Sequence, residues 1–191
     1  MNLAIDIGNS RIKAAVFEQG QAVDNFKSDK ADDAFVYSIL AAYPQISSAI
    51  IVSAREDFEK VEAAAKAKVD RYIRFDNSVK VPIKNLYKTP GTLGCDRLAA
   101  AVGANLLYPG QNTMIVDFGT AITIDLVTAE GEFLGGNISP GARTRFRALH
   151  EYTSKLPLRT LTEDISLIAD SSSTAIESGV INGLVFEIEG Y

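Results

Sequence analysis

The feature that most constrains the fold is a short stretch near the N-terminus, residues 3–16, whose pattern predicts two strands joined by a tight turn. Apolar residues enter the turn, alternating apolar residues leave it, and Asp6, Gly8, Asn9 and Ser10 lie between them. Gly8 lacks a Cβ, so its backbone can approach a ligand closely, and turn N–H groups with the Ser10 hydroxyl can bind phosphate oxygens. Asp6 repels phosphate but can bind it through Mg2+. Taken alone, the stretch is also compatible with an ordinary hairpin that has a polar tip.

The same plan recurs in residues 115–125, with Asp117 in the place of Asp6. A glycine follows each aspartate at the same distance, Gly20 in the first copy and Gly131 in the second, and separates the second strand from a third. Chance produces one such hairpin easily, but it rarely produces two with matched spacing. The repeat therefore predicts a duplicated domain whose two turns face each other across a cleft and bind one nucleotide.

Composition narrows the class of protein. A chain of 191 residues can bury one good core or two small ones, and its net charge of −5 argues against nucleic acid as the main partner. No apolar run reaches the roughly 18 residues of a membrane span, and the N-terminus enters a strand without the features of a signal peptide. The single cysteine excludes an internal disulfide and a cysteine-based zinc site. We therefore expect a cytoplasmic protein with neither a nucleic-acid nor a membrane partner.

The first part of the chain, residues 1–75, predicts the element order β-β-β-α-β-α-β. Residues 31–43 have helical spacing, and residues 55–69 are rich in Ala, Glu and Lys, which is typical of a surface helix. The wholly apolar run at residues 49–53 predicts a buried parallel strand, and residues 71–75 predict another strand. This order indicates an α/β layer with helices packed on a mixed sheet.

A loop at residues 81–97 interrupts this pattern with two prolines and two glycines, and long loops of this kind are often functional. A helix follows from Asp96 and ends before Pro109. Asp96 is expected near the positive end of the helix dipole, or simply as the residue that caps the helix. Arg97 can hold an anion. Cys95 has no Cys or His partner in the sequence, so we do not expect it to be a nucleophile.

The second meander is predicted over residues 112–138. The glycines and proline of residues 135–141 indicate a tight approach of the backbone to a ligand, or an ordinary turn before a helix that starts near residue 142. The three arginines of residues 143–147 are expected on a solvated face.

The last helix is predicted over residues 174–190, and Thr174 and Glu177 have the spacing of a capping box. Its apolar face is expected to pack either on its own sheet or on a partner subunit. That face consists of Ile176, Val180, Leu184 and Ile188. We expect the helix to leave an apolar face unmatched in its own chain and to bury it on a second copy.

Five segments, in order along the chain, resemble the motif series of type III pantothenate kinases, a family in the superfamily of acetate and sugar kinases, actin and heat-shock chaperones. The segments are Asp6-Ile-Gly-Asn-Ser10, Tyr87 with Leu93-Gly94-Cys95-Asp96-Arg97, Asp117-Phe-Gly-Thr120-Ala-Ile-Thr123, Gly135-Gly136 with Pro140-Gly141, and Thr174-Ala-Ile-Glu-Ser-Gly179. The first is shared across the superfamily, whereas the Leu-Gly-x-Asp-Arg and Gly-Thr-Ala elements together are specific. The resemblance implies an α/β fold of two ribonuclease-H-like (actin-like ATPase) domains in tandem, residues 1–110 and residues 111–191. The family is usually longer, so the second domain is expected to be incomplete at its C-terminus.

The resemblance also implies cofactors and site residues. The cofactors are ATP, Mg2+ and a monovalent cation, K+ or NH4+, and the substrate is pantothenate. Asp96 is implied as the general base, Asp117 as the ligand of the monovalent cation, Asp6 as a residue near Mg2+ and Thr120 as an ATP contact. The implied ATP phosphate loop is Asp6, Ile7, Gly8, Asn9, Ser10, Arg11, Ile12 and Lys13. The implied pantothenate contacts are Tyr87, Gly94, Cys95, Asp96, Arg97 and, across a homodimer interface near the active site, Thr174.

The implied activity is the ATP-dependent phosphorylation of pantothenate to 4'-phosphopantothenate, the first committed step of coenzyme A biosynthesis. Phosphoryl transfer requires mainly positioning and charge neutralisation, and neither a P-loop nor a Rossmann motif is present to suggest another nucleotide site. Two alternatives stay open: a non-catalytic nucleotide- or metabolite-binding regulator or inactive truncated relative on the same fold, and another small-molecule kinase of the superfamily. The presence of Asp96 beside Asp6, Arg97 and Asp117 favours the enzyme, because a pure binding protein does not need a general base.

Overall fold

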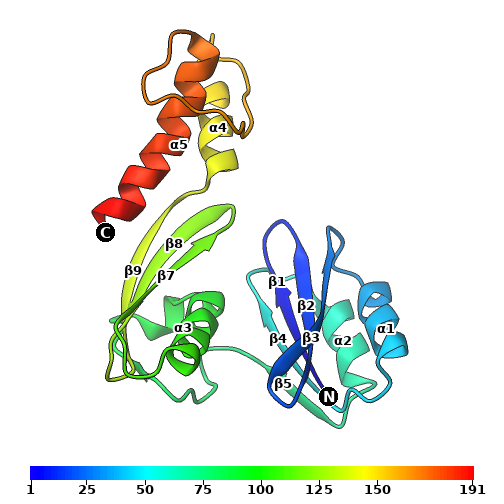
Figure 1. Ribbon diagram of the computed structural model, residues 1–191. Helices are drawn as coiled ribbons and strands as arrows, with labels where there is room; N and C mark the ends of the chain where they lie inside the picture. The colour runs from blue at the N-terminus through cyan, green and yellow to red at the C-terminus, as the bar shows by residue number, and fades with distance from the viewer.

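The computed structural model describes residues 1–191, whose strands form two separate sheets joined by a loop (Figure 1). The strands are β1 (Asn2–Ile7), β2 (Ile12–Glu18), β3 (Gln21–Ser28), β4 (Ser48–Ser53), β5 (Arg71–Arg74), β6 (Lys84–Asn85), β7 (Thr113–Phe118), β8 (Ala121–Val127) and β9 (Glu132–Pro140). The helices are α1 (Asp33–Ala42), α2 (Glu59–Lys66), α3 (Cys95–Leu107), α4 (Ala142–Glu151) and α5 (Ser172–Gly190), with a short 3₁₀ turn at Pro90–Thr92. None of these helices is both long and apolar enough to cross a membrane.

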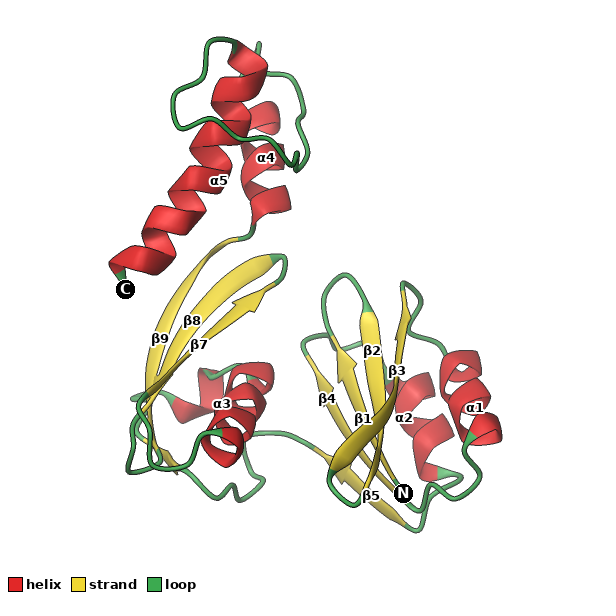
Figure 2. Ribbon diagram, viewed as in Figure 1, coloured by secondary structure: helices red, strands yellow, loops and turns green.

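The first sheet has the strand order β3-β2-β1-β4-β5, and α1 and α2 cover one of its faces (Figure 2). β1 runs antiparallel to β2 and parallel to β4, which in turn runs parallel to β5. Alternate residues of the central strands are buried with the helices in one apolar core, and Leu3, Ile7 and Ile51 have no exposed surface. The predicted order β-β-β-α-β-α-β is confirmed, as is the buried parallel strand at β4.

The second helix starts later than the sequence predicts, at Glu59 rather than near Arg55. The Ser53 hydroxyl accepts a hydrogen bond from the Arg55 N–H and donates one to the Arg55 carbonyl. Arg55 also forms an ion pair with Asp57. These local contacts satisfy the backbone in a turn, so residues 53–57 do not adopt helical geometry.

The second sheet has the order β6-β9-β8-β7, and its β7-β8-β9 meander confirms the predicted repeat of β1-β2-β3. The matched glycines both allow the turn between the second and third strands of their meander. Gly20 has a φ of +83° and Gly131 a φ of +75°, conformations that residues with a Cβ rarely adopt. β7, the counterpart of β1, is an edge strand, whereas β1 pairs on both sides. The two-residue strand β6 was not predicted, since it lies inside the long loop and pairs only with β9.

The helix α3 lies on the side of the second sheet that faces the first sheet (Figure 2). It packs on β7 and β8 and also contacts β4 of the first sheet. Its buried residues, among them Leu98 and Ala101, join Val127 and Phe133 in a second apolar core. The division of the chain at residue 110 stays a prediction, and α3 bridges the two parts that it would separate.

The helices α4 and α5 pack on each other beyond the end of the second sheet (Figure 1). They form a third apolar core with β8, made of Ile122, Ile124, Phe146, Ile176, Val180 and Leu184. The face of α5 predicted from the sequence is therefore buried mainly within its own chain. The expectation that this face lies unmatched is wrong, because α4 and β8 cover it. Other apolar side chains of α5, Val185 and Phe186, are 43% and 57% exposed.

The start of α5 also differs from the prediction. The helix is capped by Ser171, whose side chain accepts a hydrogen bond from the Thr174 N–H, while the Thr174 hydroxyl accepts one from the Ser171 N–H. The predicted capping box of Thr174 with Glu177 is therefore wrong. Glu177 instead faces the preceding loop, where its buried carboxylate pairs with Arg159.

The arginines of α4 do not all lie on a solvated face. Arg145 donates hydrogen bonds to the Pro140 carbonyl and the Ser139 hydroxyl and forms an ion pair with Glu187 of α5. The expectation of a solvated face is wrong for Arg145, because its guanidinium ties β9 to α5.

Candidate functional site

The two Asp-x-Gly turns lie next to each other, so the ends of the two sheets meet. The Ser10 Oγ of the first turn lies 2.9 Å from the Thr120 Oγ1 of the second, within hydrogen-bond distance. Each turn is closed by its own glycine: the Gly8 N–H donates to the Arg11 carbonyl, and the Gly119 N–H donates to the Ala121 carbonyl. The prediction that the two turns face each other is confirmed.

A cavity of about 1000 Å³ lies beside the first turn, between the first sheet and α3. Asp6, Arg11 and Lys13 line part of it, and most of the other lining residues are apolar. An apolar cavity with a few polar groups is the usual form of a small-molecule site. Its size and its position beside the turns suit a nucleotide.

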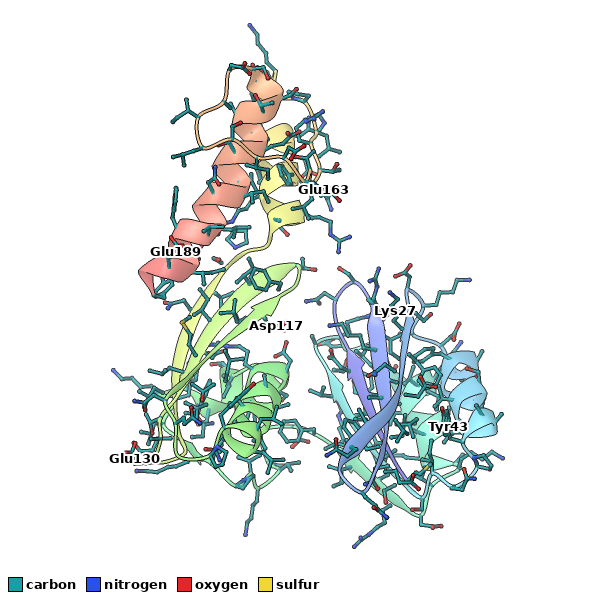
Figure 3. The ribbon with its side chains drawn as sticks, viewed as in Figure 1. Lys27, Tyr43, Asp117, Glu130, Glu163 and Glu189 are labelled. Atoms are coloured by element: carbon teal, nitrogen blue, oxygen red, sulfur yellow. The ribbon has the colours of Figure 1, made fainter.

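Three carboxylates that the sequence assigned to the site share one electrostatic environment. Burial raises the pKa of Asp6, and the negative charges of Asp96 and Asp117 raise it further, whereas Lys13 acts in the opposite direction. Lys13 lies directly opposite Asp6 in the β1–β2 register. The charges that act on Asp6 of β1 therefore come from α3 and β7 of the second part of the chain, and Figure 3 shows Asp117 on the side of the second sheet that faces the first.

Carboxylate oxygens are the protein ligands that Mg2+ prefers, and Mg2+ usually binds through one or two of them together with phosphate oxygens and water. No group of three His, Cys, Asp or Glu side chains forms a ready-made metal cage. The negative charges that act on Asp6 favour a cation beside it. The donor set therefore fits a divalent ion that is bound partly through a ligand.

Asp96 lies in the first turn of α3, and Gly94, which has no side chain to offer, occupies the capping position. The alternative in which Asp96 is simply the helix cap is therefore wrong. The Asp96 Oδ1 accepts a hydrogen bond from the Arg97 N–H at 2.9 Å. A Cβ at residue 94 would lie 2.5 Å from that oxygen, so the glycine leaves room for the carboxylate.

The neighbouring thiol of Cys95 is not activated. Its Sγ lies 3.6 Å from the Asn77 Oδ1. Burial raises the pKa of Cys95, and the charges of Asp76 and Asp96 raise it further. A raised pKa keeps the thiol protonated at neutral pH, which agrees with the expectation that it is not a nucleophile.

Arg97 is held in a buried ion pair. Its Nε and Nη2 donate to the two carboxylate oxygens of Asp125 at 3.0 and 2.5 Å, and the side chains of Arg97 and Asp125 are only 6% and 2% exposed. Two donors of the guanidinium are thus occupied by a protein carboxylate. Asp125 was not predicted as a site residue, although a charged residue between the apolar positions Ile124 and Val127 of one strand is a signal of such a partner.

Tyr87 lies against this pair. The Arg97 guanidinium carbon is 5.6 Å from the centre of the Tyr87 ring, and the ring of Phe133 is 6.3 Å away. On β9, a Cβ at Gly135 would lie 2.8 Å from the Tyr87 ring. The long loop therefore places Tyr87 between α3 and β9, against the Arg97 guanidinium.

Thr174 is not brought to this place. It lies in the first turn of α5, at the end of the α4–α5 pair farther from the two sheets (Figure 1). Its hydroxyl is used in the capping box with Ser171. The structure therefore groups the other sequence-predicted residues around the facing turns and α3 and leaves Thr174 apart.

The tight backbone approach predicted for residues 135–141 is present, but the chain itself is the partner. A Cβ at Gly136 would lie 1.8 Å from the Ile124 carbonyl oxygen, and a Cβ at Gly141 would lie 2.1 Å from the Gly119 carbonyl oxygen. Gly141 thus supports the second turn directly.

A repeated three-stranded meander with two facing Asp-x-Gly turns defines an α/β protein of the actin-like ATPase class, built from ribonuclease-H-like units. Comparison with known proteins narrows this class. The chain belongs to the type III pantothenate kinase family, whose sequence model matches residues 2–191.

Among similar proteins, the type III pantothenate kinase of Flavobacterium johnsoniae is 42% identical over all of this chain, which covers 78% of that protein. The type III pantothenate kinase of Phocaeicola vulgatus is 41% identical with the same coverage. A solved structure from Campylobacter jejuni, described as a conserved Baf family transcriptional activator, has a TM-score of 0.61 over 98% of this chain and 78% of that chain. It is 21% identical, so it supports the fold alone.

Proposed function

We propose that this chain transfers the γ-phosphoryl group of ATP to the hydroxyl of pantothenate, giving 4'-phosphopantothenate in the first committed step of coenzyme A biosynthesis. The observation that carries the proposal is the contact between the two Asp-x-Gly turns, through Ser10 and Thr120, in a chain of this family. The kinase family implies ATP and a divalent metal ion as cofactors.

In the proposed complex, ATP occupies the cavity beside the first turn. Backbone N–H groups and side chains of residues 6–13 hold the phosphates, and Thr120 approaches them from the second turn. When bound, Mg2+ neutralises charge that develops on the phosphates. Asp6 holds the metal on the protein side, and Lys13, which lies opposite Asp6 on β2, adds a positive charge.

Asp96 acts as the general base. The pantothenate oxygen attacks the γ-phosphorus, the bond from that phosphorus to the β,γ-bridging oxygen breaks, and the hydroxyl proton passes to the Asp96 carboxylate. The hydrogen bond from the Arg97 N–H orients this carboxylate. Because the transition state of phosphoryl transfer is loose, orientation of the hydroxyl is the larger part of its contribution.

Asp117 is proposed to hold the monovalent cation, K+ or NH4+. Its side chain is exposed at the end of β7 and forms no hydrogen bond or ion pair within the chain. A cation there lies at the junction of the two turns and offsets the negative charge near Asp6.

Pantothenate is proposed to contact Tyr87, the segment from Gly94 to Arg97, and Thr174. Because Thr174 lies apart from the other contacts in one chain, the proposal requires a homodimer in which the partner supplies it. The exposed Val185 and Phe186 and the groove between α4 and α5 support such an interface. Sedimentation as a monomer at micromolar concentration would contradict the dimer.

The test measures ADP release with ATP, Mg2+ and K+, with and without pantothenate. We expect pantothenate-dependent release that the Asp96→Asn variant loses while it still binds ATP. The matched control is Asp33→Asn, which changes an exposed aspartate in the first turn of α1, outside the site, and should leave release unchanged. ATP binding without pantothenate-dependent release would instead favour the non-catalytic regulator.

A further inference from the structure

The ion pair between Arg97 and Asp125 is the only one in the chain in which both side chains are less than one-tenth exposed. The pair joins the first turn of α3 to β8. Its surroundings are apolar, since Leu98, Val127 and Phe133 belong to the core beside it. The pair is therefore a charged contact inside the second apolar core.

Stability alone does not explain such a pair. Removing two charges from water costs several kcal/mol for each ion, and apolar residues of similar volume often replace a buried pair without loss of stability. What the pair provides is geometry, because the two parallel hydrogen bonds fix the plane and direction of the guanidinium. A reason for its presence should therefore be sought in what Arg97 positions.

Arg97 contacts two proposed substrate-binding residues. Its backbone N–H holds the Asp96 carboxylate, and its guanidinium lies over one side of the Tyr87 ring. The Tyr87 ring also packs closely on Gly135, where an added Cβ would lie 2.8 Å from the ring. A change in the direction of the Arg97 side chain would therefore remove a contact that holds the Tyr87 ring.

We propose that Asp125 is a positioning residue for the pantothenate site. It holds the Arg97 guanidinium, and through this group it sets the orientation of the Tyr87 ring, without touching the substrate. This inference rests on the proposed function, because Tyr87, Asp96 and Arg97 are substrate contacts only in that proposal. It also gives Arg97 a role different from the free anion-binding group that the sequence suggested.

The test substitutes Asp125→Asn, which keeps the shape of the side chain and removes its charge. We expect kcat/KM for pantothenate to fall at least about tenfold, because displacements near 1 Å have effects of this size or larger. The KM for ATP should change less than about twofold. Amide hydrogen exchange should accelerate at Leu86 and Tyr87, while the β7–β8 amides keep their protection.

Two further variants keep the test decisive. The double substitution Arg97→Met with Asp125→Leu removes both charges, so it should fold even if Asp125→Asn does not, and it should show the same faster amide exchange at Leu86 and Tyr87. The control is Glu62→Gln, which removes a partly buried carboxylate on the far side of the first sheet and should leave both KM values unchanged.

The outcomes separate the two proposals. An inactive wild-type chain overturns the proposed function, and the exchange at Leu86 and Tyr87 still decides whether Asp125 positions the loop. An active wild type with unchanged pantothenate kinetics in a folded Asp125 variant overturns the positioning role. Equal changes toward both substrates, with faster exchange throughout the second sheet, also overturn it, because they indicate a purely structural contribution.

Discussion

Substitution of Gly141 by alanine should weaken ATP binding without placing any new group in the ATP site. Gly141 lies between β9 and α4, and its N–H donates to the Thr120 carbonyl at 2.9 Å. Its φ of −67° is open to any residue, so alanine meets no backbone penalty there. The only obstacle is steric, because the new Cβ would lie 2.1 Å from the Gly119 carbonyl oxygen.

The size of the effect follows from that distance. A carbon and a carbonyl oxygen approach to about 3.3 Å at closest, so the backbone must separate by roughly 1.2 Å, the difference between about 3.3 Å and the 2.1 Å found here. Such overpacking typically costs 1–3 kcal/mol. A displacement near 1 Å of a group that positions a substrate lowers its reaction rate by up to about 100-fold. Because the turn carries Thr120, we expect the KM for ATP to rise by about tenfold or more.

The assay compares unfolding by denaturant with steady-state kinetics in two variants. Gly20→Ala is the control, since Gly20 has a φ of +83° and no atom within 4 Å of the added Cβ. It should lose about 1 kcal/mol from the strained backbone but keep the wild-type KM for ATP. If Gly141→Ala also keeps the wild-type KM and kcat despite its lower stability, the second turn does not bind the nucleotide and the reasoning is refuted.

Three further predictions concern the supporting structure. Phe146→Ala, at a site only 1% exposed, should cost about 3–5 kcal/mol in denaturant unfolding; a loss below about 1 kcal/mol would contradict the third core. Ser171→Ala should cost about 1 kcal/mol and speed amide exchange in the first turn of α5; unchanged exchange would argue against the cap. Burial raises the pKa of Glu62, but hydrogen bonds from Tyr72 and Lys66 outweigh it and hold that pKa below its usual range. The stabilisation that the ionised Glu62 provides is therefore present at neutral pH and lost as the pH falls through the lowered pKa. The difference in unfolding free energy between wild type and Glu62→Gln should shrink in acid. A difference that stays constant with pH would contradict this.

Much of the fold could be predicted from patterns of residues that are close together in the sequence. The strand alternation and the positive-φ glycines at residues 20 and 131 specify both meanders, because each depends only on residues close in the chain. The start of α2 was less predictable, since the Ser53 hydroxyl and the Arg55–Asp57 pair compete with the first helical turn. β6 depends on a partner strand 48 residues away, a distance that no local pattern reports.

In the candidate site, too, some features could be predicted from nearby residues and others could not. The duplication alone indicated that Asp6 and Asp117 approach each other, since equivalent turns of a paired fold meet. The role of Arg97 was not predictable, because its partner Asp125 lies 28 residues away on another element. From the sequence alone, Arg97 beside a glycine-containing loop suggests anion binding, because nothing local shows that Asp125 is its partner.

The two facing turns also differ in how the chain supports them, although their sequences are alike. The second turn is braced by Gly141, whose N–H binds the Thr120 carbonyl, and by Thr144, whose hydroxyl donates to the same carbonyl at 2.7 Å. The first turn has its own closing hydrogen bond and an exposed pair of Arg11 with Asp29, which adds little rigidity. The second turn is therefore a fixed reference set by β9 and α4, and the first is the one that a bound nucleotide would have to order. A duplicated motif thus gives a site with one preorganised half and one adaptable half.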